Sequence, residues 1–198
     1  AEECRMPLCY GGGVKTAAQV QRIVSLGVEK VAISSAASES PNLIAEATQC
    51  VGNQSVVVVI DVKRRLLGGK YEVRTHNAKK RTGKCPIQFS RQMEQLGAGE
   101  IVINSIDNEG KMKGYDLALV RQIREAVNVP VTVLGGAGSL RDMCELISEC
   151  RVSGAAAGSL FVFKGIYRAV LVNYPNRIEK DALVKESNRA IANCLPTG

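Results

Sequence analysis

The stretches Pro7-Leu-Cys-Tyr-Gly-Gly-Gly13 and Pro130-Val-Thr-Val-Leu-Gly-Gly-Ala-Gly138 share one pattern: an apolar strand that opens with proline and leads into a glycine turn. Each copy precedes a helical pattern and then an apolar run with small hydroxyl residues, Ser34-Ser35 in the first case and Gly158-Ser159 in the second. Glycine lets backbone N–H groups approach a ligand closely, and such groups at a strand-to-helix turn bind phosphate. Two copies therefore predict two phosphate sites and a substrate with a phosphate at each end.

Apolar runs alternate with helical patterns along the whole chain. The runs cover residues 7–10, 30–34, 56–61, 100–105, 131–134 and 154–163, and the helical patterns cover residues 17–26, 41–50, 86–96, 116–126 and 139–150. Apolar runs without a two-residue alternation are typical of parallel strands that are covered on both faces. Repeated βα units predict an α/β fold, either an α/β barrel or a doubly wound sheet.

The composition narrows the classes of function. The chain has 198 residues with 45% hydrophobic content, enough for one core. A net charge of +7 favours an anionic partner, but an aromatic content of 4% argues against a nucleic-acid-binding module. Seven cysteines without a C-x-x-C spacing indicate a reduced, cytoplasmic protein. His76 is the only histidine, so we predict no metal site, and we predict no cofactor. The apolar runs are too short to span a membrane.

Counting the units suggests a barrel with two units absent. Six βα units are present, and the glycine turns lie in the first and the fifth. If the protein is built from two similar halves, these units correspond to strands three and seven of eight. We therefore expect residues 1–198 to form a single incomplete (β/α)8 TIM-barrel domain that lacks the first two βα units. An open six-stranded sheet would otherwise leave bare edges, which natural proteins avoid.

Several motifs in order carry a resemblance to a known family. They are Gly11-Gly-Gly13, Glu29-Lys-Val-Ala-Ile-Ser-Ser-Ala-Ala37, Val56-Val-Val-Val-Ile-Asp-Val-Lys63, Gly97-Ala-Gly-Glu-Ile101, Ser105-Ile-Asp107, Gly114-Tyr-Asp116 and Gly135-Gly-Ala-Gly138. With these motifs the chain resembles the cyclase subunit of imidazole glycerol phosphate synthase, the HisF family of histidine biosynthesis. That family folds as a (β/α)8 barrel, and the similarity runs from about Pro7 to Phe163.

The resemblance implies a lyase that closes an imidazole ring. The substrate would be an aminoimidazole carboxamide ribonucleotide joined through a formimino link to a ribulose phosphate, with two phosphates. Ammonia from a glutaminase attacks, and the products are imidazole glycerol phosphate and the aminoimidazole nucleotide. This chemistry needs one carboxyl group as acid and another as base. Asp61 follows the apolar run 56–60, where barrel enzymes place catalytic groups, and the resemblance implies that it is the general acid. The alternative is a structural carboxylate that caps a turn or pairs with Lys63.

The resemblance also assigns the two phosphate sites. Gly12, Gly13, Ser34 and Ser35 would bind one phosphate, and Gly110, Gly135, Gly136 and Ser159 would bind the other. A phosphate site after strands seven and eight is common among barrels in general. The alternative is that these glycines only permit tight turns between strand and helix.

Two charged residues are candidates for an ammonia gate. Lys30 and Glu100 each begin a predicted strand, so both are expected at the bottom of the barrel. In the family, the matching lysine and glutamate form half of a gate where ammonia enters from the glutaminase. The resemblance thus implies a heterodimer with a HisH-like glutaminase subunit. The alternative for Lys30 and Glu100 is a structural ion pair.

Departures from the family pattern keep a second function open. Ser34, Asn104, Glu109, Leu134 and Val162 stand where the family has asparagine, threonine, aspartate, serine and histidine. The segment Phe161 to Pro175 resembles a HisF-like branch (WbuZ-like) that is associated with delivering ammonia for amidation of a surface-polysaccharide sugar. The basic segment 79–84 either lies near the substrate, as in the family, or is solvated. A third possibility is a structural role, in which the open sheet edges pair with another chain.

Overall fold

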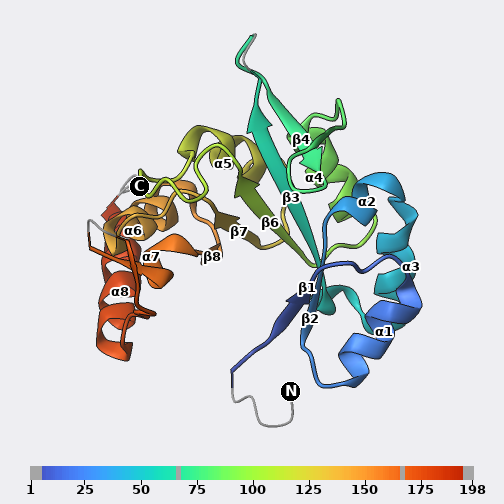
Figure 1. Cartoon of the computed structure of the whole chain (residues 1–198), viewed down its shortest axis with the longest axis horizontal. Helices are drawn as coiled ribbons and strands as arrows, with labels where there is room; N and C mark the ends of the chain where they lie inside the picture. Colours follow the sequence, from blue (N-terminus) through green and yellow to red (C-terminus); the bar gives the residue numbers. More distant parts are fainter. Residues whose placement is uncertain (1–5, 66–67, 166–167, 194–198) are drawn as a thin grey trace.

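The chain folds into a parallel sheet that curls into part of a barrel (Figure 1). The structure is a computed structural model and describes residues 6–65, 68–165 and 168–193. The strands run in the order β1-β2-β3-β6-β7-β8, and every neighbouring pair in this path is parallel. They are β1 (Cys9–Gly11), β2 (Lys30–Ile33), β3 (Val56–Arg64), β6 (Glu100–Ser105), β7 (Val131–Leu134) and β8 (Gly154–Ala155). The prediction of a parallel α/β fold is confirmed, and the curvature is that of a partial barrel.

Five helices cover the outer, convex face of this sheet (Figure 1). They are α1 (Ala17–Ser25), α3 (Asn42–Val51), α4 (Pro86–Gln95), α5 (Leu117–Arg124) and α6 (Leu140–Cys150). Each agrees with a predicted helical pattern to within two residues at either end. The apolar periodicity of the sequence predicted these helices because each of them buries one apolar face, for example Leu119, Val120 and Ile123 in α5.

The core lies between the sheet and these helices. Alternate residues of β3, namely Val56, Val58, Ile60 and Val62, are buried on the convex side. Asp61 falls between them in the alternation, so its side chain faces the concave side, which is the interior of the barrel. The same alternation leaves the concave face of β6 with partly exposed residues. The concave face is therefore where a ligand could bind.

A β-hairpin that the sequence did not predict extends β3 beyond the barrel rim. β3 continues to Arg64, and β4 (Tyr71–Thr75) pairs with it antiparallel, followed by β5 (Lys80–Arg81) on the outside of β4. The prediction that the strand ends at Asp61 is therefore wrong. The parallel part of the sheet does end nearby, because the pairing of β3 with β6 stops at Val62 and Ser105.

The predicted strand 154–163 is also wrong. Its chain forms β8, then α7 (Ser159–Val162), then the first strand of a small hairpin, β9 (Phe163–Lys164) with β10 (Ala169–Val170). The pairing of β8 with β7 covers Gly154 and Ala155, opposite Thr132 and Val133, and the chain then leaves the sheet. Three further elements were not predicted, namely α2 (Ser35–Glu39), the 3-10 turn η1 (Asn53–Ser55) and α8 (Arg177–Asn193).

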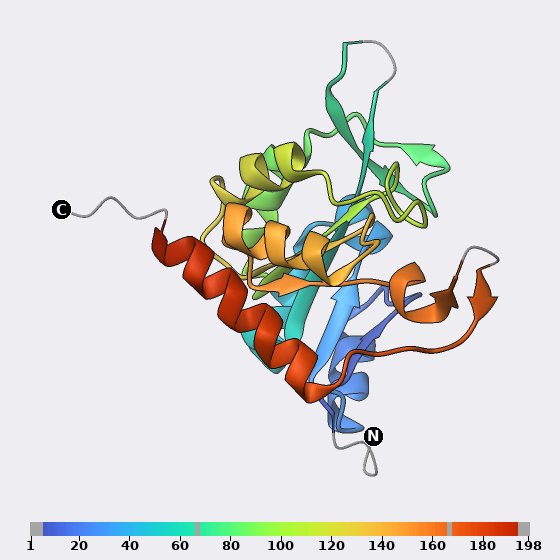
Figure 2. The same cartoon turned by 90° about the vertical axis from the view of Figure 1, so that its left-hand side faces the viewer.

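The last helix, α8, packs against α6 (Figure 2). Ser187 of α8 is buried and donates a hydrogen bond to Cys144 Sγ at 3.4 Å. Leu183 packs on the edge of the core. Within residues 6–65, 68–165 and 168–193, no helix is both long and apolar enough to cross a membrane.

Candidate functional site

A cavity of about 630 Å³ opens on the concave side of the sheet beside the first glycine turn. Its lining contains the glycines of that turn, the two serines after β2, and Asp61, together with Lys15, Glu39 and the hairpin residues His76, Asn77 and Lys79. Gly12, Gly13, Ser34 and Ser35, the residues predicted to bind one phosphate, lie together in this lining. Their binding of phosphate stays a prediction.

The first glycine turn is held open by its backbone conformation. Gly12 and Gly13 have φ values of 127° and 70°, which side-chain-bearing residues rarely adopt, and a Cβ atom on either would meet nothing within 4 Å. Helix α1 follows with a capping box, in which Thr16 accepts the Gln19 N–H and the Gln19 side chain accepts the Thr16 N–H. The turn therefore needs glycine for its φ angles and leaves space for a ligand.

Asp61 lies at the mouth of the partial barrel beside Asn104. Asn104 Nδ2 donates a hydrogen bond to Asp61 Oδ1 at 2.8 Å. Burial raises the pKa of the Asp61 carboxyl, and the hydrogen bond from Asn104 lowers it by less, so the pKa lies above the usual range of aspartate. Among the ion pairs of the described residues, none joins Asp61 to Lys63. A carboxyl whose proton is favoured by burial is suited to act as an acid.

The second glycine turn is packed against the loop that follows β6. A Cβ atom on Gly135 would lie 2.6 Å from the Ser105 carbonyl oxygen, and one on Gly136 would lie 2.1 Å from the Gly114 carbonyl oxygen. Gly110 and Ser159 are neighbours, since a Cβ atom on Gly110 would lie 3.9 Å from Ser159 Oγ. None of these second-site residues lines the cavity beside the first turn. The two predicted phosphate sites are thus separate places.

The hairpin contributes residues to the cavity that the sequence did not single out. The His76 N–H donates to Ser35 Oγ at 3.1 Å, and His76 Nε2 lies 2.9 Å from Glu39 Oε1. Lys80 Nζ also contacts Glu39, at 3.3 Å. The hydrogen bonds from His76 and Lys80 hold the pKa of the Glu39 carboxyl below its usual range. These contacts attach the hairpin turn to α2 at the edge of the cavity.

Only part of the basic segment 79–84 faces the cavity. Lys79 is in its lining, whereas Lys80 pairs with Glu39 and Lys84 Nζ donates to the Ser38 carbonyl at 2.5 Å. Lys79 thus lies where a ligand could bind, whereas Lys80 and Lys84 are bonded to protein groups; proximity of the segment to a substrate stays a prediction. The hairpin itself had a signal in the alternation of Tyr71, Val73 and Thr75, which is typical of a strand with one buried face.

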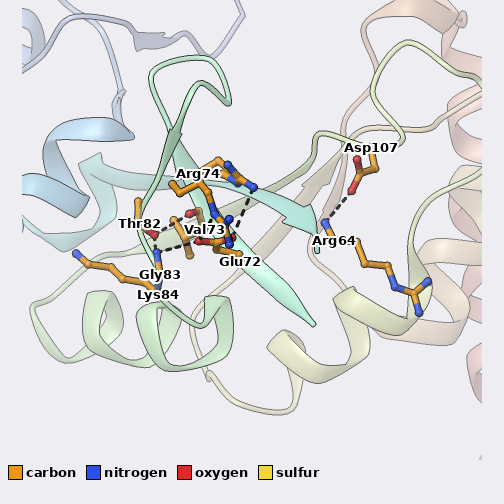
Figure 3. A network of polar contacts seen from close by, with 9 residues as sticks. Arg64, Glu72, Val73, Arg74, Thr82, Gly83, Lys84 and Asp107 are labelled. Carbon is orange, nitrogen blue, oxygen red and sulfur yellow. Dashed lines mark hydrogen bonds and ion pairs between the residues drawn. The ribbon is translucent and has the colours of Figure 1, made fainter. Parts of the chain in front are cut away.

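A carboxylate is buried on the hairpin between two arginines (Figure 3). Glu72 Oε2 lies 3.2 Å from Arg81 Nη2 and 3.6 Å from Arg74 Nη2, and Glu72 Oε1 accepts the Gly83 N–H at 3.1 Å. Burial would raise the pKa of Glu72, but these hydrogen bonds and charges together outweigh it and lower the pKa. Arg74 is directly opposite Asp61 in the register, so both side chains point to the concave side.

Two more contacts anchor the hairpin to the loop after β6. The Arg64 N–H donates to Asp107 Oδ2 at 2.7 Å (Figure 3). Tyr71 Oη donates to the Asp116 carboxylate at 2.9 Å, and burial together with Asp116 raises the pKa of Tyr71 to about 12. Asp116 also caps α5 through the Leu119 N–H. The hairpin is thereby joined to the same loop that covers the second glycine turn.

The two predicted gate residues form an ion pair across the bottom of the sheet. Lys30 Nζ lies 2.5 Å from Glu100 Oε2, and Thr132 Oγ1 donates to Glu100 Oε1 at 2.7 Å. The Glu100 side chain is 14% exposed, whereas that of Lys30 is 43% exposed. The prediction that they lie together is confirmed. Both alternatives, a gate or a structural ion pair, are compatible with this contact.

The sequence pattern of a known family matches most of the chain. The histidine biosynthesis protein family covers residues 1–167. The chain belongs to this family.

Its relatives are named as one subunit of one enzyme. A Vibrio vulnificus protein, provisionally named imidazole glycerol phosphate synthase subunit hisF3, is 55% identical over 91% of this chain and 69% of its own length. A Leptospira interrogans protein with a provisional HisF name is 54% identical over 92% of this chain and 72% of its own length. The imidazole glycerol phosphate synthase subunit HisF of Petrotoga mobilis is 41% identical over 85% of this chain and 66% of its own length. These relationships confirm the resemblance to HisF that the motifs indicated.

Proposed function

We propose that this chain is the cyclase subunit of imidazole glycerol phosphate synthase. It would use ammonia from a glutaminase to close the imidazole ring on a bisphosphorylated formimino-ribulosyl substrate. The observation that carries the proposal is the position of Asp61. This carboxyl lines a cavity that also contains a glycine turn and two serines, in a chain 39–55% identical to proteins named as HisF.

Asp61 would act as the general acid. A partly buried carboxyl with a raised pKa retains its proton to a higher pH than a solvated one, which suits it to protonate a leaving group. The step transfers the proton from the carboxyl oxygen to the departing substrate atom, and the electron pair of the O–H bond stays on Asp61. The second carboxyl of the family would come from a strand that the sheet described here does not contain.

The substrate phosphates would bind at the two glycine turns. At the first turn, Gly12 and Gly13 leave open space, and Ser34 and Ser35 supply hydroxyls. Lys15 and Lys79 line the same cavity and would balance the charge of a phosphate. At the second turn, Gly110 and Ser159 lie side by side and would bind the other phosphate.

Ammonia would enter from the bottom of the sheet, past Lys30 and Glu100. The concave face of β6 then leads from Glu100 through Val102 to Asn104, which contacts Asp61. Two-residue steps along a strand are about 6.6 Å each, so this path is on the order of 13 Å long. A HisH-like glutaminase would dock at the Lys30 end and form the heterodimer.

We further propose that two additional βα units close the barrel between β8 and β1. Both strands lie at the ends of the parallel path, and closure removes such edges. The relatives are longer than the chain, which covers 69% and 72% of the first two.

The test measures ammonium-dependent turnover of the formimino-ribulosyl substrate in a barrel completed by two further βα units. Asp61→Asn removes the acid and should lower turnover at least about 100-fold, the usual scale for a general acid. Asp181→Asn is a matched control, because it makes the same chemical change on the exposed surface of α8. A near-wild-type rate for Asp61→Asn would contradict the assignment. If the folded protein binds a glutaminase but has no turnover, the sugar-amidation alternative is favoured.

A further inference from the structure

Only one of the two polar atoms of the Asn104 side-chain amide has a hydrogen-bond partner among the described residues. Its Nδ2 donates to Asp61 Oδ1 at 2.8 Å, but its Oδ1 is buried and has no hydrogen-bond partner among the described residues. A buried polar atom without a partner is uncommon in native proteins, because it loses water and gains nothing in return. The contact seen here therefore fits one protonation state of the site, and a partner for Asn104 Oδ1 would have to come from another state.

The sheet fixes the two side chains against each other. Asp61 of β3 and Asn104 of β6 are directly opposite in the parallel register, and Ser105 pairs one step further along with Val62. The backbone positions of both residues are set by hydrogen bonds of the sheet, so neither side chain can move far from the other. What remains free is rotation of the terminal amide and carboxyl groups, since these torsions have broad, nearly two-fold preferences.

Which atom of the Asn104 amide bonds to Asp61 depends on the protonation state of the Asp61 carboxyl. An ionised carboxylate only accepts hydrogen bonds, so the amide must present its nitrogen, as it does here. A protonated carboxyl has one O–H donor, and the amide oxygen is then its natural acceptor. A half turn of the Asn104 amide would bring Oδ1 to the place that Nδ2 now occupies.

We propose that Asn104 is a positioning residue for Asp61 and that its amide turns over as the carboxyl gains or loses its proton. In the protonated state the Asp61 O–H donates to Asn104 Oδ1. For proton transfer, the Asp61 O–H turns from Asn104 Oδ1 to the substrate and breaks, the electron pair stays on Asp61, and Asn104 presents its N–H to the new carboxylate. Asp61 is therefore held in place in both states. The catalytic part of this inference rests on the proposed function, whereas the amide movement does not.

Several charged or titratable groups lie on the same side of the sheet as Asp61. On the concave side they are Lys63 of β3, Glu72 and Arg74 of β4, and the cavity residues Lys15, Glu39, His76 and Lys79. Glu72 is paired with Arg74 and Arg81, and Glu39 is paired with His76 and Lys80. Asn104 differs from all of these groups, because it is neutral and offers both a donor and an acceptor.

The first experiment needs no variant of Asn104. In the chain described here, NMR follows the Asp61 carboxyl carbon and the Asn104 side-chain N–H signals while the pH is changed. The Asn104 signals should change with the same midpoint as the Asp61 carboxyl, and Asp61→Asn should abolish that change. The proposal is overturned if the Asn104 signals stay constant through the titration of Asp61, or if they still change in Asp61→Asn.

The second experiment changes Asn104 itself. Asn104→Leu is similar in size but removes both donor and acceptor. The titration midpoint of Asp61 should rise, because the hydrogen bond lost by the ionised carboxylate is stronger than the one lost by the neutral carboxyl. Asn104→Thr keeps a group that can donate or accept, and its midpoint should stay close to that of the wild type. An unchanged midpoint in Asn104→Leu contradicts the proposal. Should that variant not fold, the first experiment still decides.

Turnover separates this inference from the proposed function. In the completed barrel, Asn104→Leu should lower kcat about tenfold with little change in KM, and its pH profile should shift in the direction of the NMR midpoint. Asn104→Thr should keep most of the turnover. If the wild type has no turnover while the NMR results hold, the proposed function fails and the amide movement stands. If turnover is present but Asn104→Leu leaves kcat and the pH profile unchanged, the positioning role is wrong.

Discussion

The two glycine turns correspond residue by residue, yet they are built for different reasons. Gly13 corresponds to Gly136 in its place before the helix, and Thr16 corresponds to Ser139 as the helix cap. A Cβ atom on Gly13 would meet nothing within 4 Å, whereas one on Gly136 would lie 2.1 Å from a backbone carbonyl. The Cβ side of Gly13 is open, and the Cβ side of Gly136 is filled by packing. The same sequence pattern therefore serves both purposes.

The charges around the two turns differ as well. Lys15 and Lys79 line the cavity at the first turn. At the second turn, the Asp142 carboxylate accepts the Gly138 N–H at 2.8 Å, and Glu109 Oε1 would lie 3.5 Å from a Cβ atom on Gly158. At the first turn the residue in the place of Asp142 is the neutral Gln19. The first cavity also contains Asp61 and Glu39, but Glu39 is paired with His76 and Lys80. At the second site, Arg168 donates to the Gly110 carbonyl at 2.9 Å, away from the Asp142 carboxylate on the turn itself. We therefore expect an anion to be favoured more strongly at the first turn.

The largest expected difference between the turns is in stability. Gly136→Ala forces a methyl group into the Gly114 carbonyl and keeps a φ of 115°, so we expect it to lower the free energy of unfolding by about 3–5 kcal/mol. Gly13→Ala meets no such contact and should cost about 1–2 kcal/mol for its φ of 70° alone. Urea unfolding of the two variants beside the wild type measures both values.

If Gly136→Ala and Gly13→Ala lowered the free energy of unfolding by similar amounts, the distinction between an open and a packed turn would be removed. A larger loss for Gly13→Ala than for Gly136→Ala would reverse it. Gly12→Ala is a useful companion variant, because Gly12 also has free space around it but a different φ of 127°.

The sequence predicted both turns but not this difference. Two glycines in a row after a strand indicate a turn wherever they occur, since the local backbone demands them. Whether space is also limiting depends on the loop 105–114, which lies about 25 residues away in the chain and reaches Gly135 and Gly136 only in the folded state. The packing role of Gly136 could therefore not be seen in the sequence.

The same reasoning explains which elements were predicted. The helices and the central strands have strong apolar periodicity of their own, and β6 and β7 agree with their predicted ranges at both ends. The hairpin strand β4 keeps an alternation of Tyr71, Val73 and Thr75, but it carries a charged residue, Glu72, at a buried position and so contains no continuous apolar run. Its burial is tolerated because Arg74 and Arg81 reach it from the same hairpin. Of the hairpin residues that line the cavity, Lys79 belongs to the basic segment 79–84, for which a place near the substrate was one predicted alternative, whereas His76 and Asn77 were not predicted as ligand candidates.

A smaller difference is expected in anion binding. In a titration of this chain with inorganic phosphate, the backbone N–H signals of Gly12 and Gly13 should report an affinity about tenfold higher than those of Gly135 and Gly136. The reason is that Lys15 and Lys79 line the first cavity, where Glu39 is already paired with His76 and Lys80, whereas the Asp142 carboxylate lies on the second turn itself. Added salt should reduce the difference, since it screens charges. Equal affinities at low salt would contradict the comparison.

The smallest effect comes from exchanging Gln19 and Asp142, the third residues of the two helices, whose side chains accept the N–H of the capping residue. Asp142→Asn gives the second turn the neutral amide of the first, and Gln19→Asp does the opposite. An acidic residue in the first turn of a helix stabilises it by about 0.3–1 kcal/mol. Asp142→Asn should therefore lower the free energy of unfolding by about that amount, and Gln19→Asp should raise it slightly.

Phosphate binding should respond to these substitutions in the opposite direction from stability. Removing the carboxylate in Asp142→Asn should strengthen phosphate binding at Gly135 and Gly136, and adding one in Gln19→Asp should weaken it at Gly12 and Gly13. Unfolding curves and phosphate titrations of the same two samples measure both effects. If stability and phosphate affinity changed in the same direction, the carboxylate of Asp142 would not be what distinguishes the two turns, and only their packing would remain. If they change in opposite directions, the second turn has gained helix stability at the expense of its affinity for an anion.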